Sequence, residues 1–387
     1  MPFSAKIGFY QDQAVAPAPG FPTWPTEPTW TEISDEMSNW SNTSAPSGFT
    51  ASYSLTYDGT NKWRGAVNHP NGNVYFVPRD ATSIIEFDPT ANIADNKTFG
   101  HTFSVNSGAY HGAVLGDNGN VYCIPFLETA VLEFDPVAGT SQEINVGYAP
   151  RLSAGIKASN GKIYCVPQQT TNSANILVID PSNSAVSVSS MQIAGGAQNS
   201  TNRYSGGTRG PDDRLYFAPM AVGTVCVIDS SNDTLVETDY GHTITGSTNR
   251  YLGAATASNG KVIFAPFNAG NVMMLDTTSN NLSQPFTIPG SHIGAVTGSD
   301  GNVHCVPWNN NEYIKYDATA NTAASINAGL STYKGYGSVL DKTGNIVIAP
   351  DSTYSEMAVV DIFGTGWTDA DTANSAFLSP WINKGTH

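Results

Sequence analysis

A unit of about 45 residues recurs seven times along the chain, and this period constrains the fold more than any other feature of the sequence. Each copy contains an apolar run that ends in proline and, roughly ten residues later, a second apolar run that ends in aspartate. The repeated residues are Pro78, Pro125, Pro167, Pro219, Pro266, Pro307 and Pro350, and Asp88, Asp135, Asp180, Asp229, Asp276, Asp317 and Asp361. A fixed period of this length indicates an array of similar structural units.

Each unit carries the signals of four short β-strands. A small residue such as Gly65 begins the first strand, and in most copies an Asn-Gly or Asp-Gly turn leads into the second. The second strand is almost continuously apolar, as in residues 121–124, which indicates that both of its faces are buried. The repeated proline suits the end of this strand, and the repeated aspartate suits a turn after the third. The pattern predicts an all-β fold, a seven-bladed β-propeller with extended N- and C-terminal arms.

The ring is expected to close through the N-terminal part of this domain. Residues after Asp361 are poor strand material, whereas residues 49–57 (FTASYSLTY) alternate like a strand and precede the first unit. We therefore expect a propeller over residues 49–361 in which strand 49–57 completes the last blade. Such a join removes the open sheet edges at the two ends of the ring.

Residues 1–48 and 362–387 form the predicted arms. The first arm has five prolines between Pro17 and Pro28, which favour an extended course. Large aromatic side chains on such segments must be buried, either on the propeller's own flank or on another subunit. The second alternative makes the protein a multi-copy component of a larger assembly, docked to its partners by five of the seven tryptophans: Trp24, Trp30, Trp40, Trp367 and Trp381.

The composition restricts the partners and cofactors. A net charge of −15 argues against binding nucleic acid through a basic surface. No apolar run is long enough to span a bilayer, and the first residues do not have the pattern of a secretory signal. Cys123, Cys165 and Cys305 take the same place in three repeats, which indicates buried free thiols. No spacing of Cys or His predicts a metal site, and no motif predicts a cofactor.

One face of the ring is the candidate binding surface. The top face, as defined here, carries the start of each first strand and the loop after each repeated proline; the bottom face is the opposite one. A cationic or imidazole side chain precedes the small residue of every first strand: Arg64, His111, Arg151, Arg203, Arg250, His292 and Lys334. Aromatic residues accompany them, including Tyr204, Tyr251 and Tyr336, and the loops add Phe126, Phe267, Trp308, Arg79 and Met220.

Three interpretations of this basic and aromatic ring remain open. In the first, each cation pairs with a repeated aspartate as a structural tie. In the second, the cations bind a carboxylate or phosphate and the flat rings lie on sugar faces, so that the top face binds an anion or a glycan. The third is catalysis by carboxylates in the top-face loops, although nothing places any pair at the separation that glycoside hydrolysis needs: Glu128, Glu312, Asp351 and Glu356. We expect no catalytic residue and no enzyme activity.

Residues 160–181 (NGKIYCVPQ…NILVIDP) and 250–276 (RYLGAATASNGKVIFAPFNAGNVMMLD) resemble the repeats of seven-bladed propellers of the kelch and YVTN groups. Similar repeats occur in uncharacterised proteins of tailed phages and algae. The resemblance covers residues 49–361 and implies the fold, but the chain lacks the regular Gly-Gly pair of kelch repeats. Streptogramin-lyase propellers are similar in architecture; their catalytic His and Glu have no matching positions here, so that activity is not carried over.

These observations predict a non-enzymatic structural or adhesion protein of a bacteriophage particle, such as a tail-fibre component. It would dock to other virion proteins through its arms and present the top face to a host-surface glycan. The arms, the charge-poor Ser/Thr/Asn-rich composition and the lack of a signal peptide favour this prediction. The alternatives are a secreted or cell-surface (extracellular) glycan-binding propeller and a polysaccharide lyase or hydrolase.

Overall fold

A computed structural model describes residues 47–51, 62–104, 108–194, 202–246, 248–288, 290–298, 300–308, 312–327, 335–350 and 357–361 of the 387-residue chain. For residues 47–51, 350 and 361 it describes the backbone. Apart from residues 47 and 48, the predicted arms lie outside the described residues. The same holds for Lys334 and for the five arm tryptophans, Trp24, Trp30, Trp40, Trp367 and Trp381.

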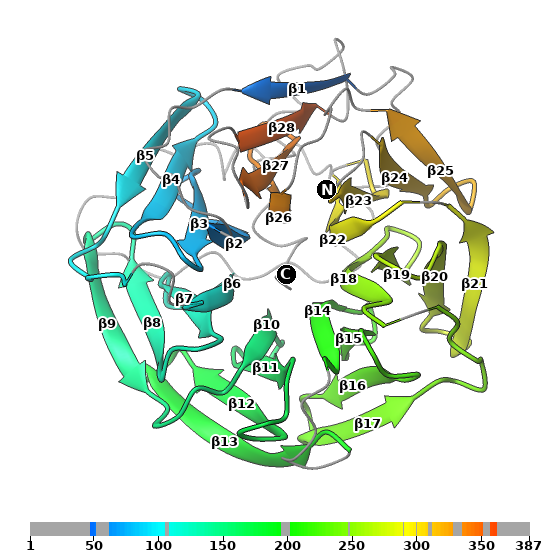
Figure 1. The fold of residues 1–387 in the computed structure, drawn as a ribbon, viewed down its shortest axis with the longest axis horizontal. Helices are drawn as coiled ribbons and strands as arrows, with labels where there is room; N and C mark the ends of the chain where they lie inside the picture. Colours follow the sequence, from blue (N-terminus) through cyan, green and yellow to red (C-terminus); the bar gives the residue numbers. More distant parts are fainter. Residues whose placement is uncertain are drawn as a thin grey trace, which may run out of the picture.

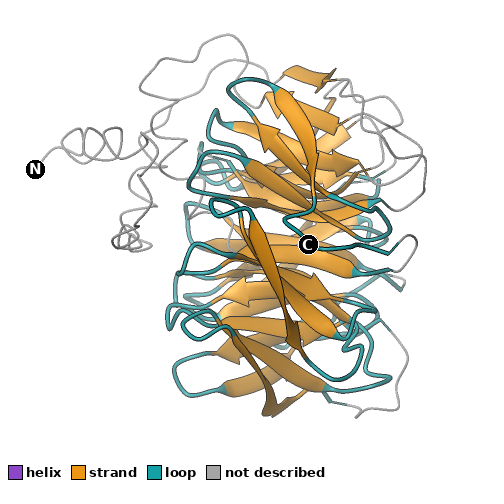
Figure 2. Ribbon diagram, turned by 90° about the vertical axis from the view of Figure 1, so that its left-hand side faces the viewer, coloured by secondary structure: helices purple, strands orange, loops and turns teal. Residues whose placement is uncertain are grey.

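The described residues form seven four-stranded antiparallel sheets set around a central axis, so the predicted seven-bladed β-propeller is confirmed (Figure 1). In blades 1 to 6 the strands follow the order of the sequence from the axis outward. The innermost strands contact one another around the ring, and the last of them contacts the first. In the side view the strands cross the thickness of the disc, and the loops lie at its two faces (Figure 2).

The strand bounds repeat regularly from blade to blade. Blades 1 to 3 consist of β2 (Trp63–Asn68), β3 (Val74–Pro78), β4 (Ile84–Asp88) and β5 (Ile93–Lys97); β6 (Tyr110–Leu115), β7 (Val121–Pro125), β8 (Ala130–Asp135) and β9 (Thr140–Asn145); β10 (Leu152–Lys157), β11 (Ile163–Pro167), β12 (Asn175–Asp180) and β13 (Ala185–Gln192). Blades 4 to 6 consist of β14 (Tyr204–Arg209), β15 (Leu215–Pro219), β16 (Val225–Asp229) and β17 (Thr234–Thr238); β18 (Tyr251–Thr256), β19 (Lys261–Pro266), β20 (Asn271–Asp276) and β21 (Asn281–Thr287); β22 (His292–Thr297), β23 (Val303–Pro307), β24 (Glu312–Asp317) and β25 (Thr322–Asn327).

Blade 7 combines strands from the two ends of the domain. It holds β26 (Gly335–Leu340), β27 (Asn345–Pro350), β28 (Met357–Asp361) and, as its outermost strand, β1 (Ser47–Ala51). β1 pairs antiparallel with β28, from Ser47 opposite Asp361 to Ala51 opposite Met357. An N-terminal strand therefore completes the last blade, at residues 47–51 instead of the predicted 49–57; residues 52–57 lie outside the described part of the chain.

The hydrophobic core lies between the blades. Strand β3 is buried along its whole length, as its unbroken apolar run predicts. On one of its faces Tyr75 and Val77 pack into blade 2, in a cluster with Val121. On its other face Val74 and Phe76 belong to a cluster shared with blade 7. Blade 1 is thus buried on both faces, and similar clusters lie between consecutive blades from blade 2 to blade 6. The loops at the top and bottom are left as the surfaces that differ between blades.

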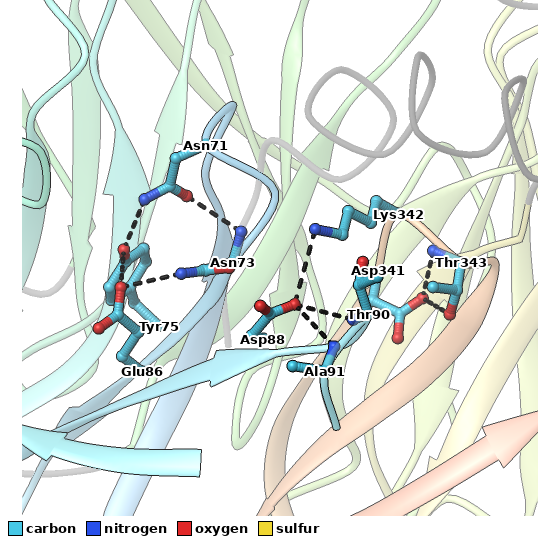
Figure 3. Close-up of polar contacts among 10 residues, drawn as sticks. All are labelled: Asn71, Asn73, Tyr75, Glu86, Asp88, Thr90, Ala91, Asp341, Lys342 and Thr343. Atoms are coloured by element: carbon cyan, nitrogen blue, oxygen red, sulfur yellow. Dashed lines mark hydrogen bonds and ion pairs between the residues drawn. The ribbon is translucent and has the colours of Figure 1, made fainter. Parts of the chain in front are cut away.

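The repeated aspartates cap tight turns at the bottom face, as the sequence predicts. In blades 1 to 6 the carboxylate accepts the backbone N–H of the residue two positions further on, at 2.8–3.0 Å. Figure 3 shows this turn for Asp88, which accepts from Thr90 and Ala91. The ammonium of Lys342, from blade 7, lies 3.7 Å from the Asp88 carboxylate and joins the first and last blades (Figure 3).

Candidate functional site

Each first strand begins at the top face opposite the repeated proline of its own blade. Trp63 pairs with Pro78 in blade 1, and the pattern continues to Gly335 and Pro350 in blade 7. Directly after this pair the ladder shifts by one residue in every blade, which is a β-bulge. Seven bulges therefore lie around the axis at the top face, and the region around the axis where the first strands begin is called the mouth.

The predicted cations occupy three different positions when they are counted from the proline pair. His292 lies opposite the proline, whereas Arg64 and His111 follow the residue that does. The remaining cations precede the strand: Arg151, Arg203, Arg250 and, by sequence, Lys334. The predicted cations, one per blade, are therefore not equivalent in the structure. They stand between one and four positions before the small residue, from Arg64 before Gly65 to Arg151 before Gly155, while the bulge is the same size in both blades.

Backbone hydrogen bonds hold the top-face loops in a chain that runs around the mouth. The N–H of Phe126 donates to the carbonyl of Ala109 in its own blade (2.8 Å), and the N–H of Arg151 in blade 3 donates to the carbonyl of Phe126 (3.0 Å). The alternation continues to blade 5 through Gln168 to Arg151, Arg203 to Gln168, Met220 to Arg203, Arg250 to Met220 and Phe267 to Arg250. The residue after each of these prolines is thus fixed on ordered backbone, which suits a preformed site.

Two sets of side chains surround the mouth, and they are not symmetric. The residues that follow the strand's first position are Arg64, His111, Ser153, Ser205, Leu252, Ile293 and Tyr336. The residues after the repeated proline in blades 1 to 6 are Arg79, Phe126, Gln168, Met220, Phe267 and Trp308. Cationic groups therefore gather at blades 1 and 2, and apolar or aromatic groups at blades 4 to 7.

The cationic cluster, defined as Arg64, Arg79, His111 and Arg151, is organised around one imidazole. Arg79 Nε lies 3.1 Å and Arg64 Nη1 lies 3.4 Å from Nε2 of His111. A guanidinium has only donors, so Nε2 accepts from both arginines and the imidazole of this geometry is neutral. Its ring stacks on Phe126, with centroids 3.9 Å apart and planes inclined by 7°.

Among the described residues, the cluster also contacts the carboxylate of Asp80, the carboxamide of Gln169 and the ring of Phe126. Arg79 Nη1 lies 2.7 Å from Asp80, which also accepts the Gly108 N–H at 2.7 Å. The guanidinium carbon of Arg151 lies 5.9 Å from the centroid of the Phe126 ring, and Arg151 donates to Gln169 at 2.9 Å. The Nε atom of Arg151 is buried and has no hydrogen-bond partner among the described residues.

The aromatic cluster consists of Phe267, Trp308 and Tyr336, from blades 5, 6 and 7. The centroids of Phe267 and Trp308 are 6.3 Å apart, and those of Trp308 and Tyr336 are 6.0 Å apart and nearly perpendicular. Phe267 and Trp308 are partly exposed and pack on the buried side chains of Leu252 and Ile293. The guanidinium carbon of Arg64 lies 3.8 Å above the Tyr336 ring, so the two clusters meet at the junction of blades 1 and 7.

Several predicted ligand-binding residues are instead parts of the scaffold. Tyr204 and Tyr251 are fully buried, and their hydroxyls bond to Glu237 and to Asn271, because each side chain points into the core between blades. His292 is also fully buried, with Nε2 3.1 Å from the carbonyl oxygen of Glu312. These three side chains expose no surface to a ligand.

Arg203 and Arg250 make contacts within the protein as well. Arg203 Nη2 lies 3.3 Å from Glu237 on the outermost strand of its blade, in a largely buried pair. Arg250 donates to the backbone carbonyls of Gly246 (3.1 Å) and Val222 (2.9 Å). The structure thus brings together Arg64, His111, Arg151 and Phe126, with Phe267 and Trp308 beside them, and separates this group from the other predicted residues.

Pairing between the cations and the repeated aspartates is excluded by the strand register. In blade 1 Arg64 adjoins the Trp63–Pro78 pair at the top, whereas Asp88 lies beyond the Val74–Phe87 pair at the other end of the sheet. Five residues of strand separate the two ends, about 16 Å. This interpretation of the repeated cations is therefore wrong.

A chain of carboxamides that the sequence prediction missed follows the cationic cluster. Gln169 is bonded to Arg151 and to Asn202 (3.4 Å), and Asn202 Nδ2 donates to Asn249 at 3.1 Å. Asn202 and Asn249 directly precede Arg203 and Arg250. This recurring Asn-Arg pair is the feature of the sequence from which the two amides could have been predicted. All three amides are partly exposed.

Among the described residues, no group of His, Cys, Asp or Glu side chains is arranged to hold a metal ion. The four cysteines are free and buried, and burial raises the pKa of each thiol. In this part of the chain no helix is long and apolar enough to cross a membrane.

No protein-family model and no curated protein matches the sequence. Among solved structures, a streptogramin B lyase is 14% identical with a TM-score of 0.66, over 81% of this chain and 98% of that chain. A virginiamycin B lyase from Staphylococcus aureus is 13% identical with a TM-score of 0.66, over 82% and 99%. The extracellular domain of a putative one-component system from B. thetaiotaomicron is 10% identical with a TM-score of 0.59, over 80% and 39%. These likenesses show the fold alone.

Proposed function

We propose that this protein is a binding propeller that recognises an anionic ligand at the cationic cluster of its top face. The observation that carries the proposal is the convergence of Arg64 and Arg79 on Nε2 of the same neutral imidazole, His111. Two guanidiniums that share one acceptor atom lie close enough to repel each other. An anion that binds there would relieve this repulsion and form charge-assisted hydrogen bonds.

The distribution of charge supports the same function. The protein carries a net charge of −15, and the repeated aspartates add to the negative charge of the bottom face. Three arginines gather at the cationic cluster, and one of them, Arg79, contacts the carboxylate of Asp80. Arginines gathered on one face of an acidic protein would attract an anion to that face in preference to the other.

We propose that the protein binds this ligand and does not catalyse a reaction on it. The lone pair of His111 Nε2 is engaged by two arginines, and Asp80 is engaged by Arg79 and the Gly108 N–H, so neither group is arranged as a general base toward a ligand. Propellers of this architecture include lyases as well as the extracellular domain of a putative one-component system, so fold likeness does not decide between catalysis and binding.

The test measures affinity for polyanions at low ionic strength. The wild-type protein should bind polygalacturonate or poly-L-glutamate more tightly than neutral dextran. The double variant Arg64→Gln/Arg79→Gln should lose at least about tenfold in affinity, because each charge-assisted hydrogen bond contributes about 1.5–3 kcal/mol.

Arg214→Gln is the matched control, since Arg214 is an exposed arginine of the bottom face, 3.8 Å from Asp212 and from Asp229. It removes one positive charge, against two in the double variant, and should leave affinity unchanged. Equal losses in the control and the double variant, or no preference for polyanions over dextran, would contradict the proposal.

The assembly in which the protein binds its ligand stays a prediction from the sequence. We propose that the tryptophan-bearing segments 1–48 and 362–387 dock the propeller to other proteins of a larger assembly, such as a phage particle. Deletion of residues 1–46, which keeps β1, tests this: the ring should stay folded while incorporation into the assembly is lost. Normal incorporation of the shortened chain would refute the docking role.

A further inference from the structure

We infer that the anionic ligand is an acidic polysaccharide, with its carboxylate at the cationic cluster and a sugar ring on the aromatic cluster. This inference rests on the proposed function and adds the chemical class of the ligand. It follows from the order of three kinds of side chain around one mouth: guanidiniums, carboxamides and aromatic rings.

The two clusters are adjacent at the ring junction, so one ligand can reach both. Arg64 contacts the imidazole of His111 on one side and the face of Tyr336 on the other. Trp308 touches Tyr336, and Phe267 touches Trp308, which extends the aromatic surface away from Arg64 across two further blades. A ligand whose anionic group binds at Arg64 therefore has its uncharged part over these rings.

Partial exposure of the aromatic cluster favours a ring with an apolar face. Phe267 and Trp308 sit on a buried base of Leu252, Ile293 and Met220, which holds them in place while leaving part of each ring exposed to solvent. The C–H face of a sugar ring packs on such aromatic surfaces, whereas the extended acidic side chains of a polypeptide present no comparable flat face.

Carboxamide side chains are the third kind of group. They adjoin the cationic cluster at Arg151, whereas the aromatic cluster adjoins it at Arg64. Gln169, Asn202 and Asn249 are linked in one chain that begins at Arg151, so their orientations are fixed. Each amide offers both a donor and an acceptor, which is the pairing that sugar hydroxyls need. A simple inorganic anion would use neither the amides nor the aromatic rings.

The test compares acidic polysaccharides with a polycarboxylate that has no sugar ring. Polygalacturonate, alginate and hyaluronan are each titrated against the full chain at matched carboxylate concentration, beside poly-L-glutamate. At least one polysaccharide should bind about tenfold more tightly than polyglutamate, which corresponds to about 1.4 kcal/mol.

Trp308→Ala and Phe267→Ala should each lower polysaccharide affinity by about fivefold or more and leave polyglutamate affinity unchanged. Val236→Ala, which truncates an exposed side chain on the outer strand β17, is the control and should change neither. Melting temperatures of all variants show whether a loss of binding reflects a loss of folding; two variants in different blades make a shared folding defect easy to recognise.

Equal affinity for polyglutamate and for all three polysaccharides would overturn the inference, and so would full retention of the preference in both aromatic variants. In either case sensitivity to Arg64→Gln/Arg79→Gln would leave the anion-binding function in place. Failure of every polyanion to bind would overturn both.

Discussion

His292 is a buried titratable group that should make the protein sensitive to acid. Burial lowers the pKa of this imidazole to about 4, against 6.5 for an exposed histidine, while its Nε2 lies in hydrogen-bond distance of the Glu312 carbonyl. The folded state therefore favours the neutral form. The preference of the folded state for the neutral imidazole contributes fully to the unfolding free energy above pH 6.5. As the pH falls toward 4, this contribution of about 3 kcal/mol is lost.

Urea denaturation between pH 4 and pH 7 measures this effect. The substitution His292→Gln should lower stability at pH 7 and flatten the fall in unfolding free energy below pH 6.5. His242→Gln is the control, because His242 is a half-buried residue in a loop after β17, and this variant should keep the wild-type slope. A His292→Gln variant with an unchanged slope would mean that other groups cause the acid sensitivity.

Asp341 makes the stability of the protein depend on pH in the opposite direction. This carboxylate is buried in the turn between β26 and β27, where it accepts from the N–H and hydroxyl of Thr343 and from the Asn345 N–H (Figure 3 shows the Thr343 bonds). Burial outweighs these bonds and raises its pKa to about 6. The folded state favours the protonated acid, so stability falls as the pH rises from about 4 to 6 and then stays lower.

The substitution Asp341→Asn keeps an oxygen acceptor for the three donors and removes the buried charge. At pH 7.5 this variant should be more stable than the wild type by about 1–3 kcal/mol, and the difference should vanish near pH 4. Chemical denaturation at both pH values checks this. A variant that is less stable at pH 7.5 would show that the fold depends on the carboxylate itself.

At the scale of the element, the bulge of the first strand constrains which residue can stand in it. Gly253 adopts a φ of +96° in the bulge of β18, and a Cβ there would lie 2.8 Å from the Cα of Gly294 in the next blade. Gly253→Ala should therefore destabilise the protein by about 2 kcal/mol or more, through strain and a backbone clash. Gly223→Ala, at a loop position with open space, should change stability by less than about 0.5 kcal/mol in the same urea titration.

The repeats show how far the sequence could predict the site. Turn glycines, strand-ending prolines and turn aspartates act through the backbone, so their spacing predicted the seven blades, the two faces and the capped turns. The bulge has the same size in blades 1 and 3, where Ala66 and Gly155 each lie opposite the second residue before the repeated proline. Gly65 stands one position earlier than the equivalent of Gly155, so the glycines used to align the repeats did not mark the same position in every blade. Arg203, for example, is tied to Glu237 on the outermost strand of its own blade, 34 residues further along the chain. Which cation is held by the scaffold and which stays at the top-face mouth therefore depended on contacts between residues that are far apart in the sequence.

At the scale of the whole molecule, the repeat separates charge and chemistry between two faces. The aspartate turns are nearly identical from blade to blade because every blade must reverse its chain at the bottom. Top-face positions carry no such requirement, since backbone hydrogen bonds already hold their loops. Side chains there can differ between blades, and this freedom permits an asymmetric cationic and aromatic site on a repetitive scaffold.

Closure of the ring by β1 gives the last prediction. β1 supplies the outermost strand of blade 7 and covers the edge of β28. Among the described residues, blades 7 and 1 also contact each other nearer the axis, for example through the bond from Asn68 to the Leu340 carbonyl. Deletion of residues 1–46 leaves β1 in place, whereas deletion of residues 1–51 removes it. The longer deletion should lower the melting temperature by about 5 °C or more relative to the shorter one and should cause concentration-dependent association, because an uncovered strand edge pairs with other chains. Differential scanning calorimetry and light scattering measure the two effects, and equal melting temperatures with no association in either shortened chain would show that β1 does not hold the ring closed.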